Sequence, residues 1–385
     1  MDIYINDLAS FLPNAPVDNA HIEDILGRVG DIPSRTKRRI LANNKIETRY
    51  YALAPISGET THTNAELTAE AVRRLRPTDG FTPDTIECLC CGTSSPDLLM
   101  PGHGVMVAGE LKLPPCDVAT TAGICVAGMT ALKYACMNVA SGTVTNAVAT
   151  GSELASSFMK ASFFPTAAHQ DADLKKKPIL GFDADFLRWM LSDGAGAAYV
   201  SGQKNRSGLC FRVDWIENRC YAGELSTCMY AGGKKMSDGR VQGWRQLASG
   251  RTAAEGNYFA VRQDVKLLDE QIIATSMGRA LPAIAAKRGL RPADIHWFLP
   301  HYSSDYFRER IYRGMEESGF VIPYAKWFTN LTQVGNIGSA SIYLLMQGLM
   351  QSGQVQDGDK VLCFIPESGR FSHCFMLLTA VAGGE

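Results

Sequence analysis

Short apolar segments and helix-like segments alternate along this chain, and the same order of segments recurs roughly 210 residues further on. The apolar segments are bounded by Gly, Pro, Asp or Ser and are typical of buried strands, at 85–94, 143–153, 195–202, 294–301, 359–368 and 371–382. Helices are predicted at 64–76, 125–141, 266–289, 304–319 and 339–353, and Pro282 predicts a kink or break in the third. This alternation predicts an α/β fold with helix-covered sheets.

The recurrence suggests two halves with one strand–helix–strand plan. The helix that opens at Cys125 in the first half corresponds to the helix that follows Asn336 in the second. We therefore expect an N-terminal half over residues 1–202 and a C-terminal half over 203–385, packed so that equivalent element ends face one cleft. Residues 156–189 and 214–262 look like insertions on this plan, and insertions this long are usually lids, binding walls or interface arms.

Charge and hydropathy exclude several partners. The chain has 385 residues and a formal net charge of -1, which gives no reason to expect nucleic acid or an anionic membrane surface. No apolar run reaches the roughly 18 residues that a bilayer span needs. The N-terminus has no basic region or small-residue cleavage site, so it is not a signal peptide. We expect a cytoplasmic protein.

The cysteines do not form a metal site. There are 11 of them, an odd and scattered set that fits free thiols in a reducing compartment. The one cluster, "CLCC" at Cys88, Cys90 and Cys91, lacks the spacing of zinc ligands and lies in an apolar segment. We interpret it as small side chains in a buried strand, and we expect no metal and no cofactor.

Cys125 differs from the other cysteines in its position. In "TTAGICVAGM" it stands at the entry of a predicted helix, directly after a turn that Gly123 allows. The positive end of a helix dipole lowers the pKa of a thiol, and the free amides of such a turn can hold an oxyanion. The alternative is a buried cysteine without a chemical role, and position alone leaves that alternative open.

Two other polar residues lie at ends of predicted elements. His301 ends an apolar strand, where ligand crevices of α/β folds form, whereas His296 lies inside the same strand and is better explained as structural. Asn336 lies in the loop "TQVGNIGSAS" before a small-residue helix. Each alone has an ordinary structural explanation, but cysteine, histidine and asparagine together are a known nucleophile set.

The sequence resembles the ketoacyl-ACP synthase III family of the thiolase superfamily over about residues 1 to 382. The resemblance is carried by "CGTSSPDLLMPG", "CDVATTAGICVAGMTALKYA", "LSDGAGAAYV", the Pro-His pair that ends in His301, and "GNIGSAS". It implies a thiolase-like fold, in which two pseudo-duplicated α/β halves form a five-layered αβαβα arrangement. It also implies a condensing enzyme that joins two acyl thioesters in fatty-acid or specialised lipid or polyketide biosynthesis.

The resemblance assigns roles residue by residue. Cys125 would take the acyl group as a thioester, and His301 with Asn336 would stabilise the enolate of the second substrate. The backbone amides of Cys125 and of a residue near Ser368 would form the oxyanion hole. Met100 falls where the family has a residue that closes the acyl pocket of the partner in a homodimer.

Three departures from the family bear on the substrate. Tyr302, Ser303 and Ser304 follow the histidine in place of Gln-Ala-Asn, and "PESGRF" replaces a glycine-rich loop. The family's early tryptophan, which stacks on the CoA adenine, has no counterpart, which favours acyl carrier protein as the donor on both sides, with a CoA thioester as the alternative. These features resemble a branch associated with dialkylresorcinol and aryl-polyene lipids.

The carrier protein is acidic, so we expect it to dock on a local basic patch. The candidates are Arg308, Arg310 and Arg313 on the helix after His301, with "RTKRR" at 35–39 as a second group; ordinary solvated faces are the alternative.

Three other functions compete with condensation. An acyltransferase of the same fold would pass the acyl group to an alcohol or amine, but such enzymes often lose the asparagine. An inactive partner subunit of a heterodimer would not need Cys125, His301 and Asn336. A papain-type hydrolase has no place for "DGAGA" and "GNIGSAS".

Overall fold

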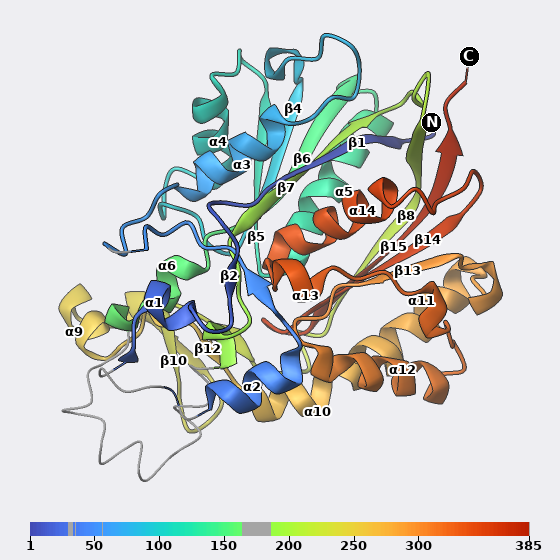
Figure 1. The fold of residues 1–385 in the computed structure, drawn as a ribbon. Coiled ribbons are helices and arrows are strands. Elements are labelled where there is room, and N and C mark those ends of the chain that lie inside the picture. The colour runs from blue at the N-terminus through green and yellow to red at the C-terminus, as the bar shows by residue number, and fades with distance from the viewer. Residues whose placement is uncertain (30–33, 35, 56, 164–185, 385) are drawn as a thin grey trace.

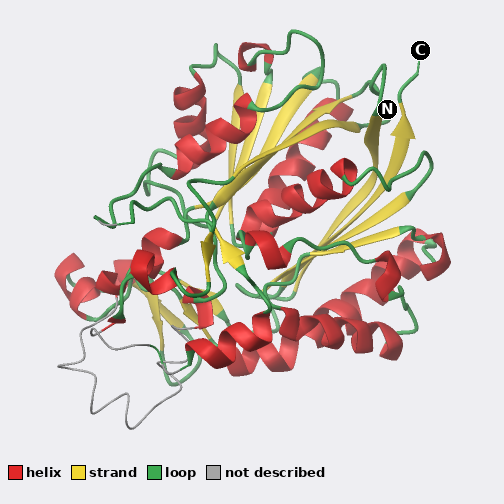
Figure 2. Cartoon of the chain, viewed as in Figure 1, coloured by secondary structure: helices red, strands yellow, loops and turns green. Residues whose placement is uncertain are grey.

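The computed structural model describes residues 1–29, 34, 36–55, 57–163 and 186–384, and these are the described residues below. The middle of the predicted insertion 156–189 and Arg35 of the second basic group lie outside them. The described chain is a mixed α/β structure built on one nine-stranded sheet (Figures 1 and 2). Along the sheet the strands are β13 (Trp297–Pro300), β14 (Lys360–Glu367), β15 (Ser372–Ala382), β8 (Leu209–Cys220), β1 (Tyr4–Phe11), β7 (Gly194–Ser201), β6 (Asn146–Glu153), β4 (Cys88–Thr93) and β5 (Asp117–Ala122).

The main helices are α3 (Asn64–Arg73), α4 (His103–Leu111), α5 (Val126–Ala140), α10 (Val265–Thr275), α11 (Leu281–Arg288), α12 (Arg308–Glu317) and α14 (Ser341–Gln351). Pairing within the sheet is parallel for β5–β4–β6 and for β13–β14 and antiparallel elsewhere. The sheet has two halves, which meet where β8 lies next to β1. Two residue pairs join them, Tyr4 with Arg212 and Ile5 with Phe211.

Alternating side chains of the strands divide the core into layers. On β4, Leu89 and Cys91 pack with α3 and α4, whereas Cys90 points to the opposite face and packs with α5 and α14. On β14, Cys363 joins the α5–α14 core and Phe364 packs with α10 to α12. The central helices α5 and α14 therefore lie between the two halves of the sheet, and other helices cover the outer face of each half (Figure 1). This is the five-layered αβαβα arrangement that the resemblance implied.

Glycines allow α5, β6 and the turn before α14 to approach each other closely. A Cβ on Gly128 of α5 would lie 2.3 Å from the backbone oxygen of Ser339, and one on Gly151 of β6 would lie 2.2 Å from the same oxygen. No side chain fits at either position. The small residues of "VAGMTAL" and "GNIGSAS" therefore bring the helix that Cys125 opens next to the loop that holds Asn336.

The predicted elements are confirmed in outline, with differences at their ends. The helix predicted over 266–289 is broken as Pro282 predicted: α10 ends at Thr275, a π-helical turn covers Ser276–Ala280, and α11 begins at Leu281. Proline has no N–H for the helical ladder, so the hydrogen-bond pattern changes just before it. The strands β1 and β5 were not predicted, because their polar and small residues hide the alternation.

The insertion proposed at 214–262 begins too early. Residues 209–220 form β8, which pairs with β15 along its whole length. The charged residues Arg212, Asp214 and Glu217 concealed the strand. They find partners in the fold: Arg212 pairs with Asp214 at 2.9 Å, and Lys287 reaches Glu217 at 2.7 Å. The division of the chain into halves at 202 and 203 stays a prediction. In the described ranges, none of the helices combines the length and apolar character needed to cross a membrane.

Candidate active site

One cavity of about 490 Å³ contains all three residues of the predicted site. Cys125, His301 and Asn336 line it, and they come from the start of α5, the loop after β13 and the loop before α14. Its volume is within the range of pockets that bind small molecules. Its walls are mostly apolar and include Phe158, Met159, Phe186, Leu187, Leu268, Ile272, Phe307 and Phe364. Described residues of both predicted insertions, among them Met159 and Met229, therefore serve as binding walls.

Cys125 immediately precedes the first residue of α5, as predicted, with φ −63° and ψ −31°. The expectation of a lowered thiol pKa is wrong. Burial raises the pKa of the Cys125 thiol well above its usual range, and the carboxylates of Glu367 and Glu153 raise it further. These two acidic side chains come from the ends of two distant strands, β6 and β14.

Glu367 occupies two of the amides at the turn that was expected to leave its amides free. Its Oε2 accepts the N–H of Ile124 at 3.0 Å and the N–H of Val126 at 2.9 Å, on either side of Cys125. A negative charge at the helix N-terminus cancels the positive end of the dipole. The sequence analysis did not include Glu367 among the site residues. A signal for it exists in "FIPESGRF", where an acidic residue ends an apolar strand.

Glu153 is the second acidic residue at the cavity. It is 3% exposed at the end of β6, and its carboxylate accepts the Ser94 hydroxyl at 2.5 Å, the Ser95 hydroxyl at 2.9 Å and the N–H of Ser339 at 3.2 Å. Burial raises its pKa, while these donors favour the charged form. The carboxylate thus ties the β4 end to the turn before α14, a structural role that was also missed.

His301 follows β13 and is held by its backbone, whose N–H donates to the oxygen of Phe364 at 2.8 Å. Burial lowers its pKa to about 4, so the imidazole is neutral near pH 7. Among the described residues no side chain hydrogen bonds to its ring, which leaves one ring N–H free to donate into the cavity.

Asn336 is fixed on both sides. Its backbone N–H donates to Met190 at 3.0 Å, and its backbone oxygen accepts the N–H of Ser192 at 2.9 Å. The side-chain oxygen accepts the N–H of Gly338 at 2.9 Å. With its oxygen occupied, the side chain presents its NH₂ group as a donor. The site thus holds two neutral donors, His301 and Asn336, beside one thiol.

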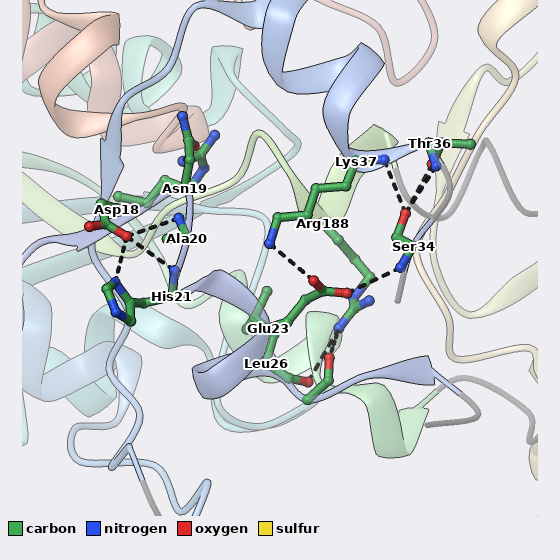
Figure 3. A network of polar contacts seen from close by, with 12 residues as sticks. Asp18, Asn19, Ala20, His21, Glu23, Leu26, Ser34, Thr36, Lys37 and Arg188 are labelled. Carbon is green, nitrogen blue, oxygen red and sulfur yellow. Dashed lines mark hydrogen bonds and ion pairs between the residues drawn. The ribbon is translucent and has the colours of Figure 1, made fainter. Parts of the chain in front are cut away.

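The segment that follows residue 185 forms part of the cavity wall and is anchored by Arg188. This buried guanidinium donates to the backbone oxygens of Gly27 at 2.7 Å, Leu26 at 3.3 Å and Met159 at 2.9 Å. Figure 3 shows it beside the ion pair of Glu23 and Lys37, whose atoms are 3.0 Å apart. These contacts link the cavity wall to α1 (Ile22–Leu26) and α2 (Lys37–Asn44).

Of the two other residues predicted for the site, one lines the cavity and one does not. Ser368 lines the cavity, and its hydroxyl donates to Gln263 at 3.2 Å; its part in an oxyanion hole stays a prediction. Met100 does not line the cavity of its own chain and is 74% exposed.

The arginines of α12 are partly neutralised. Arg310 pairs with Asp269 at 2.6 Å and Arg313 with Glu309 at 2.5 Å, whereas Arg308 lies over the ring of Tyr324 at 4.3 Å. Within the described ranges no group of side chains could hold a metal ion.

Comparisons with known proteins agree with this geometry. Residues 285–369 match the family described as 3-oxoacyl-(acyl-carrier-protein) synthase III C terminal. A beta-ketoacyl-(acyl-carrier-protein) synthase III of Chlamydia caviae is 24% identical over 379 residues, 97% of this chain and 96% of the relative. The enzyme of the same name from Cereibacter sphaeroides is 24% identical over 92% of both chains.

Solved structures share the fold. The tetronic acid condensing enzyme AbyA1 superposes with a TM-score of 0.76 at 20% identity and covers 98% of this chain and 99% of its own. FabH of Pseudomonas aeruginosa, a 3-oxoacyl-(acyl carrier protein) synthase III, gives a TM-score of 0.71 at 16% identity, covering 100% of this chain and 99% of its own. The five layers of the described residues are those of the thiolase fold, which these structures share. The chain is thus similar to the ketoacyl-ACP synthase III family, by the match of its C-terminal part and by curated relatives that are 24% identical over most of its length.

Proposed function

We propose that the protein is a condensing enzyme that forms a carbon–carbon bond between two acyl thioesters, with the first acyl group held on Cys125. The observation that carries this proposal is the single, mostly apolar cavity that contains Cys125 together with the neutral donors His301 and Asn336. The names of the relatives support it, since they are synthases and condensing enzymes. The products belong to fatty-acid or specialised lipid or polyketide biosynthesis in the cytoplasm.

The first half-reaction loads the enzyme. The sulfur of Cys125 attacks the carbonyl carbon of an acyl thioester, and the acyl chain packs against the apolar wall. The backbone N–H groups of Cys125 and Ser368 stabilise the oxyanion of the tetrahedral intermediate. The bond to the donor thiol then breaks, and the acyl group remains on Cys125.

The second half-reaction forms the new bond. His301 and Asn336 donate to the thioester carbonyl of the second substrate and stabilise the enolate that forms on decarboxylation or deprotonation. The enolate carbon attacks the acyl carbonyl on Cys125, and the bond to sulfur breaks. Because both donors are uncharged, they favour the developing negative charge without holding the neutral substrate as an ion pair.

The substrates are carried by acyl carrier protein on both sides. The absence of the family's CoA-stacking tryptophan from the sequence between residues 31 and 53 supports this, with CoA thioesters as the alternative donors. The basic residues of α12 are the proposed docking site for the acidic carrier. The segment "PESGRF" favours the lipid branch with dialkylresorcinol and aryl-polyene products.

We further propose a homodimer. Leu98, Leu99 and Met100 are 46%, 73% and 74% exposed on one loop, and solvent-exposed apolar side chains in a row are unusual on a monomer. The neighbouring strand β5 is an edge strand, which proteins usually cover. Burying the loop and the edge against a second copy removes both exposures.

Intact-protein mass spectrometry tests the central step. The protein is incubated with a panel of acyl carrier proteins bearing different acyl groups, and a mass increase that matches one acyl group is expected. Cys125→Ser should lose this increase, whereas Cys116→Ser, which removes a partly exposed thiol just before β5, should keep it. An undiminished mass increase in Cys125→Ser would contradict the acyl-enzyme.

A further inference from the structure

Glu367 is fastened beside the nucleophile through one carboxylate oxygen. It is the last residue of β14, is 8% exposed, and lines the catalytic cavity. Its Oε2 accepts the N–H groups of Ile124 and Val126 at 3.0 and 2.9 Å, and these two residues flank Cys125. The two hydrogen bonds fix an ionisable group beside the backbone that carries the thiol.

The other oxygen is free. No hydrogen bond from a described residue reaches Oε1 of Glu367. Gly369, which also lines the catalytic cavity, leaves room around it: a Cβ at that position would lie 3.2 Å from Oε1. A carboxylate with one anchored and one free oxygen can accept a proton without losing its position.

A second, smaller pocket is also lined by Glu367. It measures about 220 Å³ and is lined by Glu367 together with Thr130 of α5, Asn218 and Arg219 of β8, and Ser372 of β15. The side-chain oxygen of Asn218, one of these lining residues, is buried without a hydrogen-bond partner among the described residues. Buried polar atoms beside a cavity of this size are typically satisfied by ordered water. Glu367 therefore lines both the substrate cavity and a second pocket that has room for water.

We propose that Glu367 is the general base that accepts the thiol proton of Cys125 during loading, and that water in the smaller pocket receives this proton afterwards. The proposal rests on the proposed function. As the sulfur of Cys125 bonds to the acyl carbon, its S–H bond breaks and the proton passes to Oε1 of Glu367. The bond between the acyl carbon and the donor sulfur then breaks. The donor leaves as a thiolate that takes a proton from water, and Glu367 returns its own proton to water.

The surrounding charges show why this thiol needs a base. Burial and two carboxylates raise the pKa of Cys125, so the thiolate is scarce near pH 7. Burial also raises the pKa of Glu367, which makes the carboxylate a stronger base. The other titratable groups around it are Glu153, His301 and Arg370 at the catalytic cavity and Arg219 and Cys220 at the smaller pocket. His301 is neutral but is proposed to serve the second substrate.

The test is the pH dependence of loading in Glu367→Gln. Glutamine keeps an oxygen for the two amides but cannot take a proton. Rapid-quench loading from an acyl N-acetylcysteamine thioester should be roughly 10²- to 10⁴-fold slower than in the wild type at pH 7. The wild-type rate should level off once Glu367 is ionised, whereas the rate of the variant should keep rising as the thiol itself ionises. Loading at the wild-type rate, or faster, in Glu367→Gln at pH 7 would overturn the proposal, because the carboxylate would then only neutralise the helix end.

A second measurement needs no variant. Proton transfer to Glu367 during attack should make wild-type loading slower in D₂O, whereas attack by a preformed thiolate should give no slowing, and that result would also overturn the proposal. Failure of the proposed function looks different, since the wild type would then accept no acyl group from any carrier or small thioester.

Discussion

The side-chain oxygen of Asn336 accepts the backbone N–H of Gly338 at 2.9 Å, so the asparagine presents its NH₂ group, and not its oxygen, as the free half of the amide. Gly338 begins the tight turn before α14, with φ +47°, a backbone conformation that side chains rarely adopt. The turn therefore fixes both the position of Asn336 and the direction of its hydrogen bonding.

Replacing Asn336 should separate loading from condensation. Asn336→Asp keeps an oxygen for Gly338 but replaces the donor by a negative charge, and Asn336→Ala removes the side chain. Both should still be acylated at Cys125 and should form condensed product about 10² to 10³ times more slowly, because one enolate donor is lost. The mass of the acyl-enzyme and the rate of product formation are measured together. A variant that loads and turns over like the wild type would favour the acyltransferase alternative.

Buried histidines should make the protein sensitive to acid. Burial lowers the pKa of His103 and of His301 to about 4 and that of His373 to about 3, below the value of about 6.5 for an unfolded histidine. The unfolded state therefore binds more protons between these values, and stability that is complete above about pH 6.5 falls as the pH falls toward 4. Each histidine should contribute up to about 1.4 kcal/mol per pH unit.

Denaturant unfolding at pH 7 and pH 5 checks this expectation. His373→Gln can keep the contact with the Thr275 hydroxyl, which lies 2.7 Å from the histidine ring, but cannot be protonated. This variant should lose less stability between pH 7 and pH 5 than the wild type. The exposed His296 offers the control, since His296→Gln should leave the pH dependence of the buried groups unchanged.

Charge on the exposed apolar loop should separate the dimer. Met100→Glu should reduce the mass in sedimentation equilibrium from roughly twice 41.8 kDa toward 41.8 kDa, because a carboxylate would have to be desolvated in the interface. Met236→Glu is the matched control. Met236 is a methionine that is 45% exposed and lies outside the proposed interface, directly after β10 (Gly233–Lys235). A wild-type protein that sediments as a monomer at micromolar concentration would exclude the dimer.

Docking of the carrier protein should depend more on Arg308 than on its neighbours. No described carboxylate pairs with Arg308, whereas Arg313 is paired with Glu309 at 2.5 Å, so Arg308 offers the freer charge. Arg308→Glu should raise KM several-fold for a carrier-bound substrate, with an effect that salt weakens. It should leave KM for a small thioester unchanged. Arg313→Glu should have the smaller effect, and an equal loss on both kinds of substrate would indicate misfolding instead.

The residues of the site could be found from the sequence because each is marked by its place at the end of an element. Apolar segments end at His301, and a glycine turn precedes both Cys125 and Asn336, so element boundaries could be read locally. The arrangement of the layers was also within reach, since it follows from the alternation of strands and helices and from the family resemblance. The strand β8 was not, because its charges are satisfied only by partners such as Lys287.

Hydrophobic periodicity, turns and caps are local properties of the chain, so the elements could be predicted from the sequence, and the family resemblance implied which residues meet at the cavity. The electrostatic surroundings of the nucleophile arise instead from contacts that form in the folded chain. A helix N-terminus read alone predicts a lowered thiol pKa, but Glu367 and Val126, 241 positions apart, meet in the folded protein and reverse that prediction. Electrostatic effects depend on distance in space and on burial, and neither is written in the neighbourhood of Cys125 along the chain.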